Sequence, residues 1–494
     1  MSNLSELLPA GAGGKNVSFV ASGTLPNGKP VILNANGTVT VVSESTISSS
    51  LGTAVAYNDD TGSCAIAYDS TNNKILIAYR NTSNDDGECI VGTVSGTSIS
   101  FGSAAVFATN IQGDGNRQIG ICFNSTESKF FIVYRDATIN NSGRAITATI
   151  SGTSVSFGST AVFTTDVTNH QSCSYDSTSN KVIVIYRNSL QSNKGYAVVG
   201  TISGTSISFG TPVVFDSTSN YGINLVSIHD PNENKTVIVY GLTQGRAIVG
   251  TVSGTSISFG TAVVFSTAQT EMQSISFDSK NNKILVCYAN SGNSGYGTAK
   301  VGTVSGTSIS FGSAEVFQSS STALTQFMPA YNVAAGKTVI GYAAYNGSAW
   351  LGTYVEATVS GTSVSFSTPV VFESASISHS PKAAAYDSTS KVVVFPYRDG
   401  GNSNYGTAIV YRSTYISTNL TATNFIGISD SAISSGAAGK ATIKGGIKTG
   451  LSSLTPNAVY YVQGDGNITT ASASPAVRIG KALSSTSINL EYNS

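Results

Sequence analysis

The chain has 494 residues, of which 40% are hydrophobic and only 11% are charged, and its formal net charge at pH 7 is zero. Soluble proteins usually carry charges on roughly 25% of their residues, so this surface must be polar but mostly uncharged. Such a surface gives no electrostatic attraction for nucleic acid, which is not expected as a partner. The apolar content is sufficient for a packed core, which excludes a disordered chain.

Membrane insertion and secretion are not expected either. No stretch approaches the roughly 20 apolar residues that cross a bilayer, and the first residues, MSNLSELLPAGAGGK, lack the basic and apolar regions of a secretion signal. The five cysteines stand singly in apolar stretches, without the close spacing of a metal or redox site. We therefore expect small core residues, no metal or cofactor, and assembly in a reducing cytoplasm. The cysteines are Cys64, Cys89, Cys122, Cys173 and Cys287.

Residues 1–45 are expected to form the first part of a small β-rich module. The segment KPVILNANGTVTVV (29–42) has two apolar runs around an Asn-Gly step, which is typical of a β-hairpin. The next segment, ISSSLGTAVAY (47–57), instead resembles SISFGTAVVF (256–265), which belongs to the repeats that follow.

Residues 46–415 contain a repeat of about 50 residues. The glycine of a Ser-Gly-Thr-Ser turn recurs as Gly96, Gly152, Gly204, Gly254, Gly306 and Gly361. A lysine that precedes an apolar run recurs as Lys74, Lys129, Lys181, Lys235, Lys283, Lys337 and Lys391. A unit of this length with four strands is typical of a β-propeller blade.

The first repeat shows the four strands: strand a ends at 65–68, strand b is 75–79, strand c is 89–94 and strand d is 99–107. Strand b is apolar at almost every position, so we expect neighbouring blades to cover both of its faces. The last repeat stops after its strand c, and residues 47–57 would supply the missing strand d. We predict an all-β protein with a seven-bladed β-propeller of four-stranded blades, closed by this N-terminal strand.

Residues 416–494 would complete the module that residues 1–45 begin. They contain AVYYVQGDGNITT (458–470) and RIGKALSSTSINLEY (478–492), which alternate apolar and polar residues around turn signals. Because the first and last strands of the propeller would pair, both flanks should leave the ring at the end where the Ser-Gly-Thr-Ser turns lie. The predicted parts are therefore 1–45, 46–415 and 416–494.

The two flanks resemble terminal modules of tail-fibre and related virion proteins of tailed bacteriophages, those of marine phages and cyanophages in particular. The resemblance covers the two flanks, about a quarter of the chain, and rests on LPNGKPVILNANGTVTVV (25–42) and on residues 450–490. It implies a virion protein that is assembled in the host cytoplasm and contacts other virion proteins through this module. Homo-oligomerisation is possible, but no coiled-coil heptads accompany the fibre-type flanks to support it. The pattern comprises Tyr460-Tyr461-Val462-Gln463, Asp465-Gly466, Ser474-Pro475 and Gly480-Lys481-Ala482.

The two ends of the repeats differ in a way that indicates where binding occurs. The a–b and c–d turns, which define the turn face, are nearly uniform among the repeats. The b–c loops and d–a links, which define the loop face, vary in length and sequence. Variable loops on a rigid scaffold usually carry binding sites, so we predict that the loop face binds the ligand.

Four arginines follow the last tyrosine of strand b in repeats that a closed ring would make neighbours. A crescent of guanidinium groups on the loop face suits an anionic group of a host cell-surface glycan. The alternative is a structural role, in which the arginines pair with Asp136, Asp399 or loop carbonyls. The arginines are Arg80, Arg135, Arg187 and Arg398; Gly241, Ala289 and Ala343 occupy this position elsewhere.

Four aromatic residues stand where a b–c loop enters strand c: Tyr196, Tyr296, Trp350 and Tyr405. Flat rings present apolar faces to sugar rings at low entropic cost. The alternative is that these rings only cap the strand ends against the next blade.

An arginine cluster on a propeller also raises the hypothesis of a sialidase. Such an enzyme needs a tyrosine nucleophile with a carboxylate base, and general glycoside hydrolysis needs two carboxylates at a set separation. Asp-box turns ending in tryptophan are missing, and loop aspartates are more often turn formers. We therefore expect that the chain is not an enzyme and that it acts as an adhesin. The second hypothesis is an architectural virion protein, and the third is a polysaccharide depolymerase. The loop carboxylates are Asp85, Asp86, Glu88, Asp114, Asp166 and Asp216.

Overall fold

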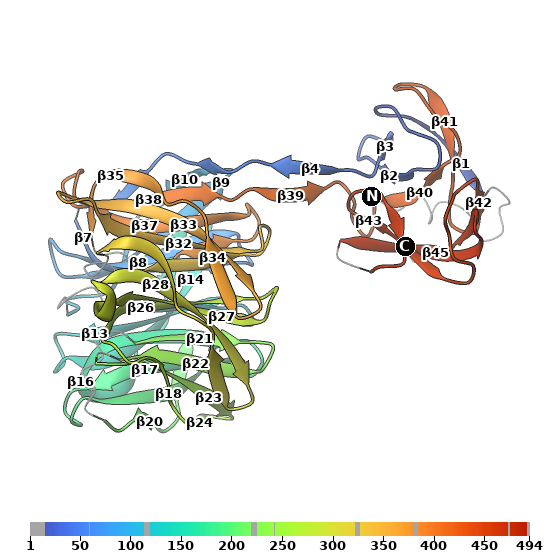
Figure 1. The fold of residues 1–494 in the computed structure, drawn as a ribbon. Helices are drawn as coiled ribbons and strands as arrows, with labels where there is room; N and C mark the ends of the chain where they lie inside the picture. The colour runs from blue at the N-terminus through green and yellow to red at the C-terminus, as the bar shows by residue number, and fades with distance from the viewer. Residues whose placement is uncertain are drawn as a thin grey trace. The chain divides into compact units, whose positions relative to one another are not determined.

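The structure is a computed structural model, and it describes residues 15–58, 60–112, 119–218, 225–241, 243–321, 327–378, 383–472 and 475–491. The chain divides into two compact units (Figure 1). The repeat unit is Ser49–Ser413, and the terminal unit combines Met1–Ser48 with Thr414–Ser494. Asp114, His379 and Ser474 lie outside the described residues.

Both units are built from antiparallel strands, which confirms the predicted all-β class. Among the described residues the helical element is one short 3-10 turn, η2 (Ser291–Asn293). No helix in this part of the chain is long and apolar enough to span a membrane.

The first four repeats form antiparallel sheets in the order a, b, c, d. Repeat 1 contains β7 (Thr61–Asp69), β8 (Lys74–Asn81), β9 (Gly87–Ser95), β10 (Ser98–Phe101) and β11 (Ala105–Ala108). Repeat 2 contains β12 (Gly120–Asn124), β13 (Lys129–Asp136), β14 (Ser142–Ser151), β15 (Ser154–Phe157) and the start of β16 (Ala161–Asp176). Repeat 3 contains the rest of β16, β17 (Lys181–Asn188), β18 (Lys194–Ser203), β19 (Ser206–Phe209) and β20 (Val213–Asp216). Repeat 4 contains β21 (Val226–Asp230), β22 (Lys235–Tyr240), β23 (Gly245–Ser253), β24 (Ser256–Phe259) and β25 (Val263–Ser266).

The remaining repeats follow the same order, and strand d is split into two segments that both pair with strand c. Repeat 5 contains β26 (Thr270–Asp278), β27 (Lys283–Asn290), β28 (Tyr296–Ser305), β29 (Ser308–Phe311) and β30 (Glu315–Ser321). Repeat 6 contains β31 (Met328–Asn332), β32 (Lys337–Tyr345), β33 (Trp350–Ser360), β34 (Ser363–Phe366) and β35 (Val370–Ser378). Repeat 7 contains β36 (Ala385–Asp387), β37 (Val392–Asp399) and β38 (Tyr405–Arg412).

The strand d of repeat 7 comes from the beginning of the chain. β5 (Ser50–Leu51) and β6 (Val55–Asn58) pair antiparallel with β38, with Leu51 opposite Tyr411 and Ala56 opposite Thr407. The first strand of the repeat unit therefore completes its last sheet, as the match between residues 47–57 and the strand-d pattern predicts.

Apolar clusters fill the spaces between consecutive repeats, and each draws its buried side chains from two of them. Strand b explains the pattern, because its alternate residues face opposite neighbours. In β8, Leu76 and Ala78 pack toward repeat 2, whereas Ile75 and Ile77 pack toward repeat 7. The apolar run of strand b is thus covered on both faces, as predicted.

One packing contact recurs in every repeat near the loop face. A buried tyrosine lies near the end of strand b, a glycine lies near the start of strand c, and an aromatic ring of strand d lies over that glycine. A Cβ atom on any of these glycines would come within 2.7 Å of the ring, so only glycine fits. Six rings are phenylalanines of the repeats, and the seventh is Tyr57 of β6, which covers Gly406. The phenylalanines are Phe107, Phe163, Phe215, Phe265, Phe317 and Phe372.

The turn face is uniform because its turns use the same internal bonds. An aspartate at the end of strand a accepts hydrogen bonds from the turn amides, as Asp69 does from Thr71 and Asn72 at 2.8 and 3.0 Å. Four of the repeated lysines then donate to strand c, as Lys74 does to the Thr93 hydroxyl at 2.8 Å; the others are Lys129, Lys181 and Lys337. These four lysines are therefore structural.

The terminal unit interleaves the two ends of the chain. In its first sheet, two C-terminal strands lie between N-terminal ones, in the order β1 (Asn16–Val20), β41 (Ala438–Thr442), β40 (Phe425–Ser429), β2 (Pro30–Leu33), β3 (Val39–Val41). Its second sheet is entirely C-terminal, in the order β42 (Ile447–Thr449), β46 (Ser487–Leu490), β45 (Ala476–Ser484), β43 (Val459–Gln463), β44 (Ile468–Thr469). A ribbon of β4 (Glu44–Ile47) and β39 (Tyr415–Thr418) accompanies them. One apolar cluster joins the two sheets.

The packing of Tyr57 leads to a test of the last sheet. The ring is buried and lies 5.4 Å from Tyr79 and 5.5 Å from Phe101. We expect Tyr57→Ala to lower the free energy of unfolding by about 3–5 kcal/mol, the usual effect of removing a buried aromatic ring. Thermal denaturation followed by circular dichroism measures the change. Val106→Ala, on an exposed strand-d position, is the control and should change stability by less than about 0.5 kcal/mol. Equal melting temperatures for wild type and Tyr57→Ala would contradict the role of this ring.

Candidate functional site

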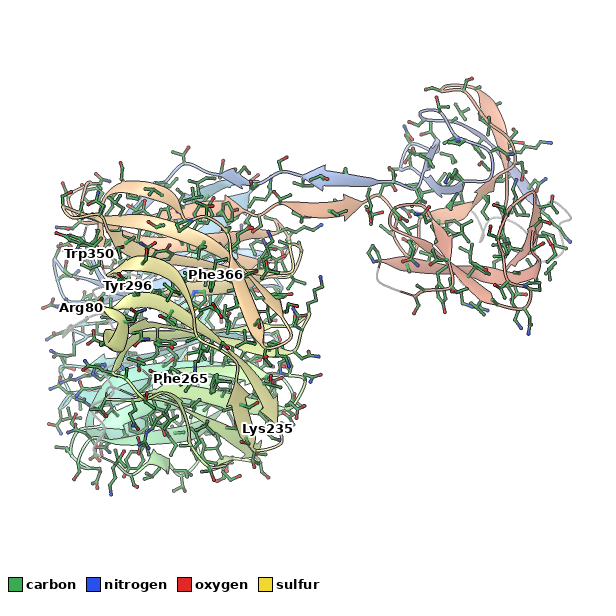
Figure 2. The ribbon with its side chains drawn as sticks, viewed as in Figure 1. Arg80, Lys235, Phe265, Tyr296, Trp350 and Phe366 are labelled. Atoms are coloured by element: carbon green, nitrogen blue, oxygen red, sulfur yellow. The ribbon has the colours of Figure 1, made fainter. Side chains whose placement is uncertain are left out.

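The loop face gathers all eight residues that the sequence singles out, because each stands at the end of strand b or the start of strand c. Figure 2 shows Arg80, Tyr296 and Trp350 at one side of the repeat unit and Lys235 at the other. The loops that carry these residues differ from repeat to repeat.

Arg80 and Arg398 are both engaged in ion pairs. The Arg80 guanidinium contacts the carboxylate of Asp85 in its own b–c loop, and the two side chains are 18% and 47% exposed. The Arg398 Nη2 donates to Asp60 Oδ1 at 3.0 Å. Asp60 lies at the entry to repeat 1, so this second pair connects repeat 7 to repeat 1.

The Asp60 carboxyl is affected by the charges of both Arg398 and Arg80. Burial raises the pKa of its carboxyl, but the Thr82 hydroxyl and the guanidinium groups of Arg398 and Arg80 outweigh that effect. The net pKa therefore lies below the ordinary value, and the carboxyl is ionised at neutral pH.

Arg135 and Arg187 belong to repeats 2 and 3. Arg135 is buried and its Nη1 donates to Asn169 Oδ1 of repeat 3 at 2.7 Å. Arg187 lines a small hollow of about 10 Å³ together with Asp216 and Tyr240. Like Arg398, Arg135 contacts a group supplied by the next repeat.

The alternative of structural arginines gains support, but through partners that the sequence did not indicate. Asp136 lies 3.7 Å from Arg144 instead, and Asp399 accepts hydrogen bonds within its own loop, from Gly401 at 2.9 Å. The partners observed are Asp85, Asp60 and Asn169. An anionic ligand at the crescent would have to compete with the carboxylates of Asp85 and Asp60.

The four predicted aromatic residues are half-buried rather than exposed. Tyr196 stacks on Tyr186, with ring centroids 5.7 Å apart and planes 17° apart. Trp350 packs at the edge of the cluster between repeats 6 and 7. Tyr296 and Tyr405 stand opposite Asn290 and Asp399 in their hairpins. Each ring therefore both caps a strand end and keeps part of its surface accessible to a ligand.

The structure adds Tyr345, which sequence reasoning missed. This residue is 39% exposed, and its ring lies 5.0 Å from the ring of Trp350 across the hairpin that joins β32 to β33. The Asn346-Gly347 step is a hairpin signal, but a two-residue turn there would have placed Tyr345 opposite Ser348 instead of Trp350. This is the one cross-hairpin aromatic pair on the described part of the loop face that contains an exposed ring.

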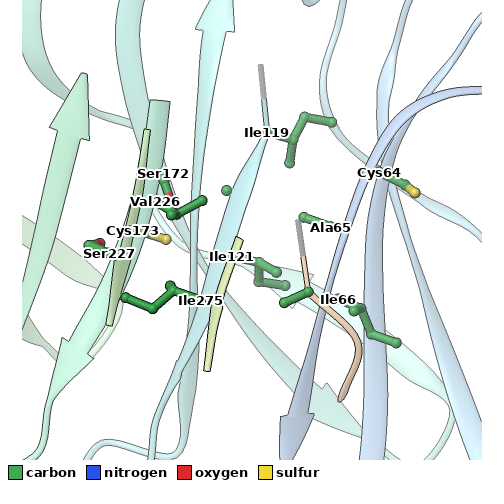
Figure 3. A pocket seen from close by; sticks show the side chains of 12 residues that line it. Cys64, Ala65, Ile66, Ile119, Ile121, Ser172, Cys173, Val226, Ser227 and Ile275 are labelled. Atoms are coloured by element: carbon green, nitrogen blue, oxygen red, sulfur yellow. The ribbon is translucent and has the colours of Figure 1, made fainter. Parts of the chain in front are cut away.

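A central cavity of about 100 Å³ is the other candidate site (Figure 3). Strand a or the residues just before it line this cavity in repeats 1, 2, 3, 4, 5 and 7, so the first strands of these repeats converge there. The side chains that line it include Ile66, Ile121 and Ile275, with Ser172 and Ser227 as hydroxyl groups. Ligand pockets usually measure about 300–1,000 Å³, so this cavity is too small to hold a sugar.

The loop carboxylates are engaged with other groups of the protein. Asp216 Oδ1 forms a turn by accepting from the Thr218 amide at 2.9 Å, whereas Asp166 accepts from the Asn188 side chain at 2.8 Å. A tyrosine–carboxylate pair exists, since Tyr79 donates to Glu88 at 2.7 Å, but Tyr79 is fully buried. Within the described residues no three His, Cys, Asp or Glu side chains are grouped to hold a metal ion.

No family model matches the chain, and no curated protein is similar to it in sequence. The backbone is similar to that of AofleA from Arthrobotrys oligospora, at 10% identity and a TM-score of 0.41, over 72% of this chain and 99% of that one. A triple arginine-to-alanine mutant of AofleA is similar at 10% identity and a TM-score of 0.40, over 70% of this chain and 96% of that one. The leech intramolecular trans-sialidase complexed with 2,7-anhydro-Neu5Ac is similar at 8% identity and a TM-score of 0.42, over 73% of this chain and 68% of that one. Similarity at this level does not identify a ligand.

The prediction that the chain is not an enzyme is wrong as an exclusion, because an enzyme, the trans-sialidase, is among the similar structures. The prediction relied on missing sequence motifs and on loop aspartates in turns. Neither observation excludes a reaction, so catalysis must be measured together with binding.

The lowered pKa of Asp60 leads to a test of the connection between repeats 7 and 1. We expect Asp60→Asn to destabilise the protein at pH 7 by up to about 1 kcal/mol, since the pair is partly exposed. A depressed folded-state pKa stabilises the protein above the ordinary value of about 3.9, and this stabilisation is lost as the pH falls through the lowered value. The melting-temperature difference between wild type and variant should therefore be constant from pH 7 to 5 and vanish toward pH 2. A pH-independent difference would refute the assignment. As the control, Asp60→Asn is introduced into the Arg398→Gln variant. There it should lower the melting temperature at pH 7 by less than it does in the wild type.

Proposed function

We propose that residues 49–413 form a closed, seven-bladed β-propeller that binds host cell-surface carbohydrate through its loop face. Support for closure comes from the pairing of β6 with β38 and from the apolar cluster that Tyr57, Ile75 and Val392 share between repeats 7 and 1. A ring closed in this way leaves no sheet with an uncovered apolar face.

The observation that carries the binding proposal is the contrast between the two faces. The polar groups of the turn face form hydrogen bonds within their own repeat, as those of Asp69 and Lys74 illustrate. The loop face presents partly exposed rings, such as Tyr345 and Tyr405, beside loops rich in Asn, Ser and Gly. Rings beside adaptable hydrogen-bonding groups suit ligands that are apolar on one face and rich in hydroxyl groups on their edges.

We further propose that the chain is a virion protein of a tailed bacteriophage. The resemblance of residues 25–42 and 450–490 to tail-fibre-type modules is its main support. These segments fold together as one compact unit with its own apolar cores, which suits a module that attaches to other virion proteins. The location is then the virion, after assembly in the host cytoplasm.

An architectural role without a receptor is the second candidate. It is favoured by the internal partners of Arg80, Arg135 and Arg398, which explain these arginines without any ligand. Binding to host cells distinguishes the two roles.

The test is binding of the labelled full-length chain to cells of the host, compared with binding to cells stripped of surface polysaccharide. We expect saturable binding that Tyr296→Ala combined with Tyr405→Ala weakens at least about tenfold, or 1.4 kcal/mol. The matched control combines Tyr68→Ala with Tyr175→Ala, which removes two half-buried tyrosines from the turn face and should leave binding unchanged.

Release of oligosaccharides into the medium is measured in the same assay, because it would identify a depolymerase. A folded wild-type chain that binds no host cells would overturn the receptor proposal. Immunolabelling of purified phage particles tests the virion location independently.

A further inference from the structure

We propose that the hairpin between β32 and β33 is a preformed platform for a neutral pyranose, with Tyr345 and Trp350 as its two contact residues. This inference depends on the proposed carbohydrate binding and specifies where the sugar lies and which charge it carries. We call this pair the aromatic platform.

The geometry of the pair suits stacking on a sugar ring. The centroids of Tyr345 and Trp350 lie 5.0 Å apart and their planes are tilted by 37°. The Tyr345 ring is exposed, whereas Trp350 is half-buried because it packs against the cluster between repeats 6 and 7. One ring thus anchors the platform to the core while the other offers its surface to solvent.

Internal hydrogen bonds hold the hairpin in this arrangement. Asn346 Oδ1 accepts from the Ser348 amide at 3.0 Å and the Ala349 amide at 2.8 Å. The Tyr345 hydroxyl donates to the carbonyl of Gly347 at 2.8 Å, which fixes the ring over the turn. The Trp350 amide donates to the Ser376 hydroxyl at 3.1 Å, which connects the hairpin to β35. A platform ordered before binding loses less conformational entropy when a ligand arrives.

The charge of the ligand follows from the surroundings. The hairpin sequence, YNGSAW, contains no ionisable group apart from the tyrosine hydroxyl. The guanidinium groups of Arg80 and Arg398 are paired with carboxylates, and that of Arg135 with an amide. An anionic sugar would gain no free cation on this hairpin and would have to disrupt existing pairs elsewhere. A neutral sugar needs only the rings and the polar rim of Asn346, Ser348 and Ser376.

The ligand class is therefore a neutral hexopyranose that presents an apolar C–H face, such as a β-galactoside or β-glucoside unit of a surface polysaccharide. Its C–H face would lie on Tyr345 and Trp350, and its hydroxyl groups would meet the hydroxyl and amide groups of the rim.

Trp350 is the single tryptophan of the chain, so its fluorescence reports on this hairpin alone. The experiment titrates the full-length protein with methyl β-galactoside, methyl β-glucoside, methyl α-mannoside and neutral polysaccharide from the host, and in parallel with sialyllactose and heparin. We expect a saturable fluorescence change with at least one neutral probe. The affinity should be the same at 0.05 and 0.5 M NaCl, because no charge pair contributes.

Three variants separate contact from positioning. Tyr345→Ala should weaken binding of the neutral probe at least about tenfold, or 1.4 kcal/mol. Asn346→Ala should weaken it less and broaden the fluorescence response, because the rings remain but their order is lost. Tyr68→Ala, a half-buried tyrosine of the turn face, is the control and should leave this titration unchanged. Near-ultraviolet circular dichroism establishes that each variant is folded.

The outcomes distinguish this inference from the proposed function. Host-cell binding without any response of Trp350 to the neutral probes would overturn the inference and leave the proposed function intact. A response only to sialyllactose or heparin that weakens with salt would also overturn it, in favour of an anionic ligand at the arginines. Absence of both cell binding and sugar binding would instead remove the proposed function itself.

Discussion

Every strand b in the repeat unit is apolar on both faces, and this constraint governs the rest of the unit. Such a strand cannot lie at a solvent-exposed sheet face, so each sheet needs a neighbour on both sides. Side chains from consecutive repeats supply that cover, and at the last position the cover depends on residues from the start of the chain. Tyr57 covers Gly406 in the same way as Phe107 covers Gly87. The N-terminal strand therefore makes the contact that strand d makes in the other repeats. The last sheet is therefore complete only when both ends of the unit are folded.

This packing also determines which groups are available for binding. The core contact of tyrosine, glycine and aromatic ring occurs just beneath the loop face, so the loops start from fixed positions whatever their sequence. On the turn face the same few hydrogen bonds recur, and the polar groups there are used internally. On the loop face the repeats diverge, and the hairpin of Tyr345 and Trp350 shows how a loop can itself be ordered by local bonds. A rigid interior thus carries an end that can vary without loss of stability.

The sequence predicts the strands well because their signals are local and occur seven times, so each copy supports the others. The Asn36-Gly37 and Asp465-Gly466 hairpins of the terminal unit are confirmed for the same reason. The partners of the arginines were not predictable, because Asp60 and Asn169 come from the next repeat and depend on how far one sheet is rotated against another. Tyr345 was missed because its position has no counterpart among the other repeats, and a search by repeat position cannot find it.

The closing strand has a mechanical consequence as well. The repeat unit joins the terminal unit through two covalent connections, one before Ser49 and one after Ser413, and these follow strands that pair with each other at Ser50 and Arg412. A force that separates the two units would be divided between these two chain segments. A single proteolytic cut in one segment leaves the other as a tether. The repeat unit would therefore stay attached after damage that would release a unit held by one linker.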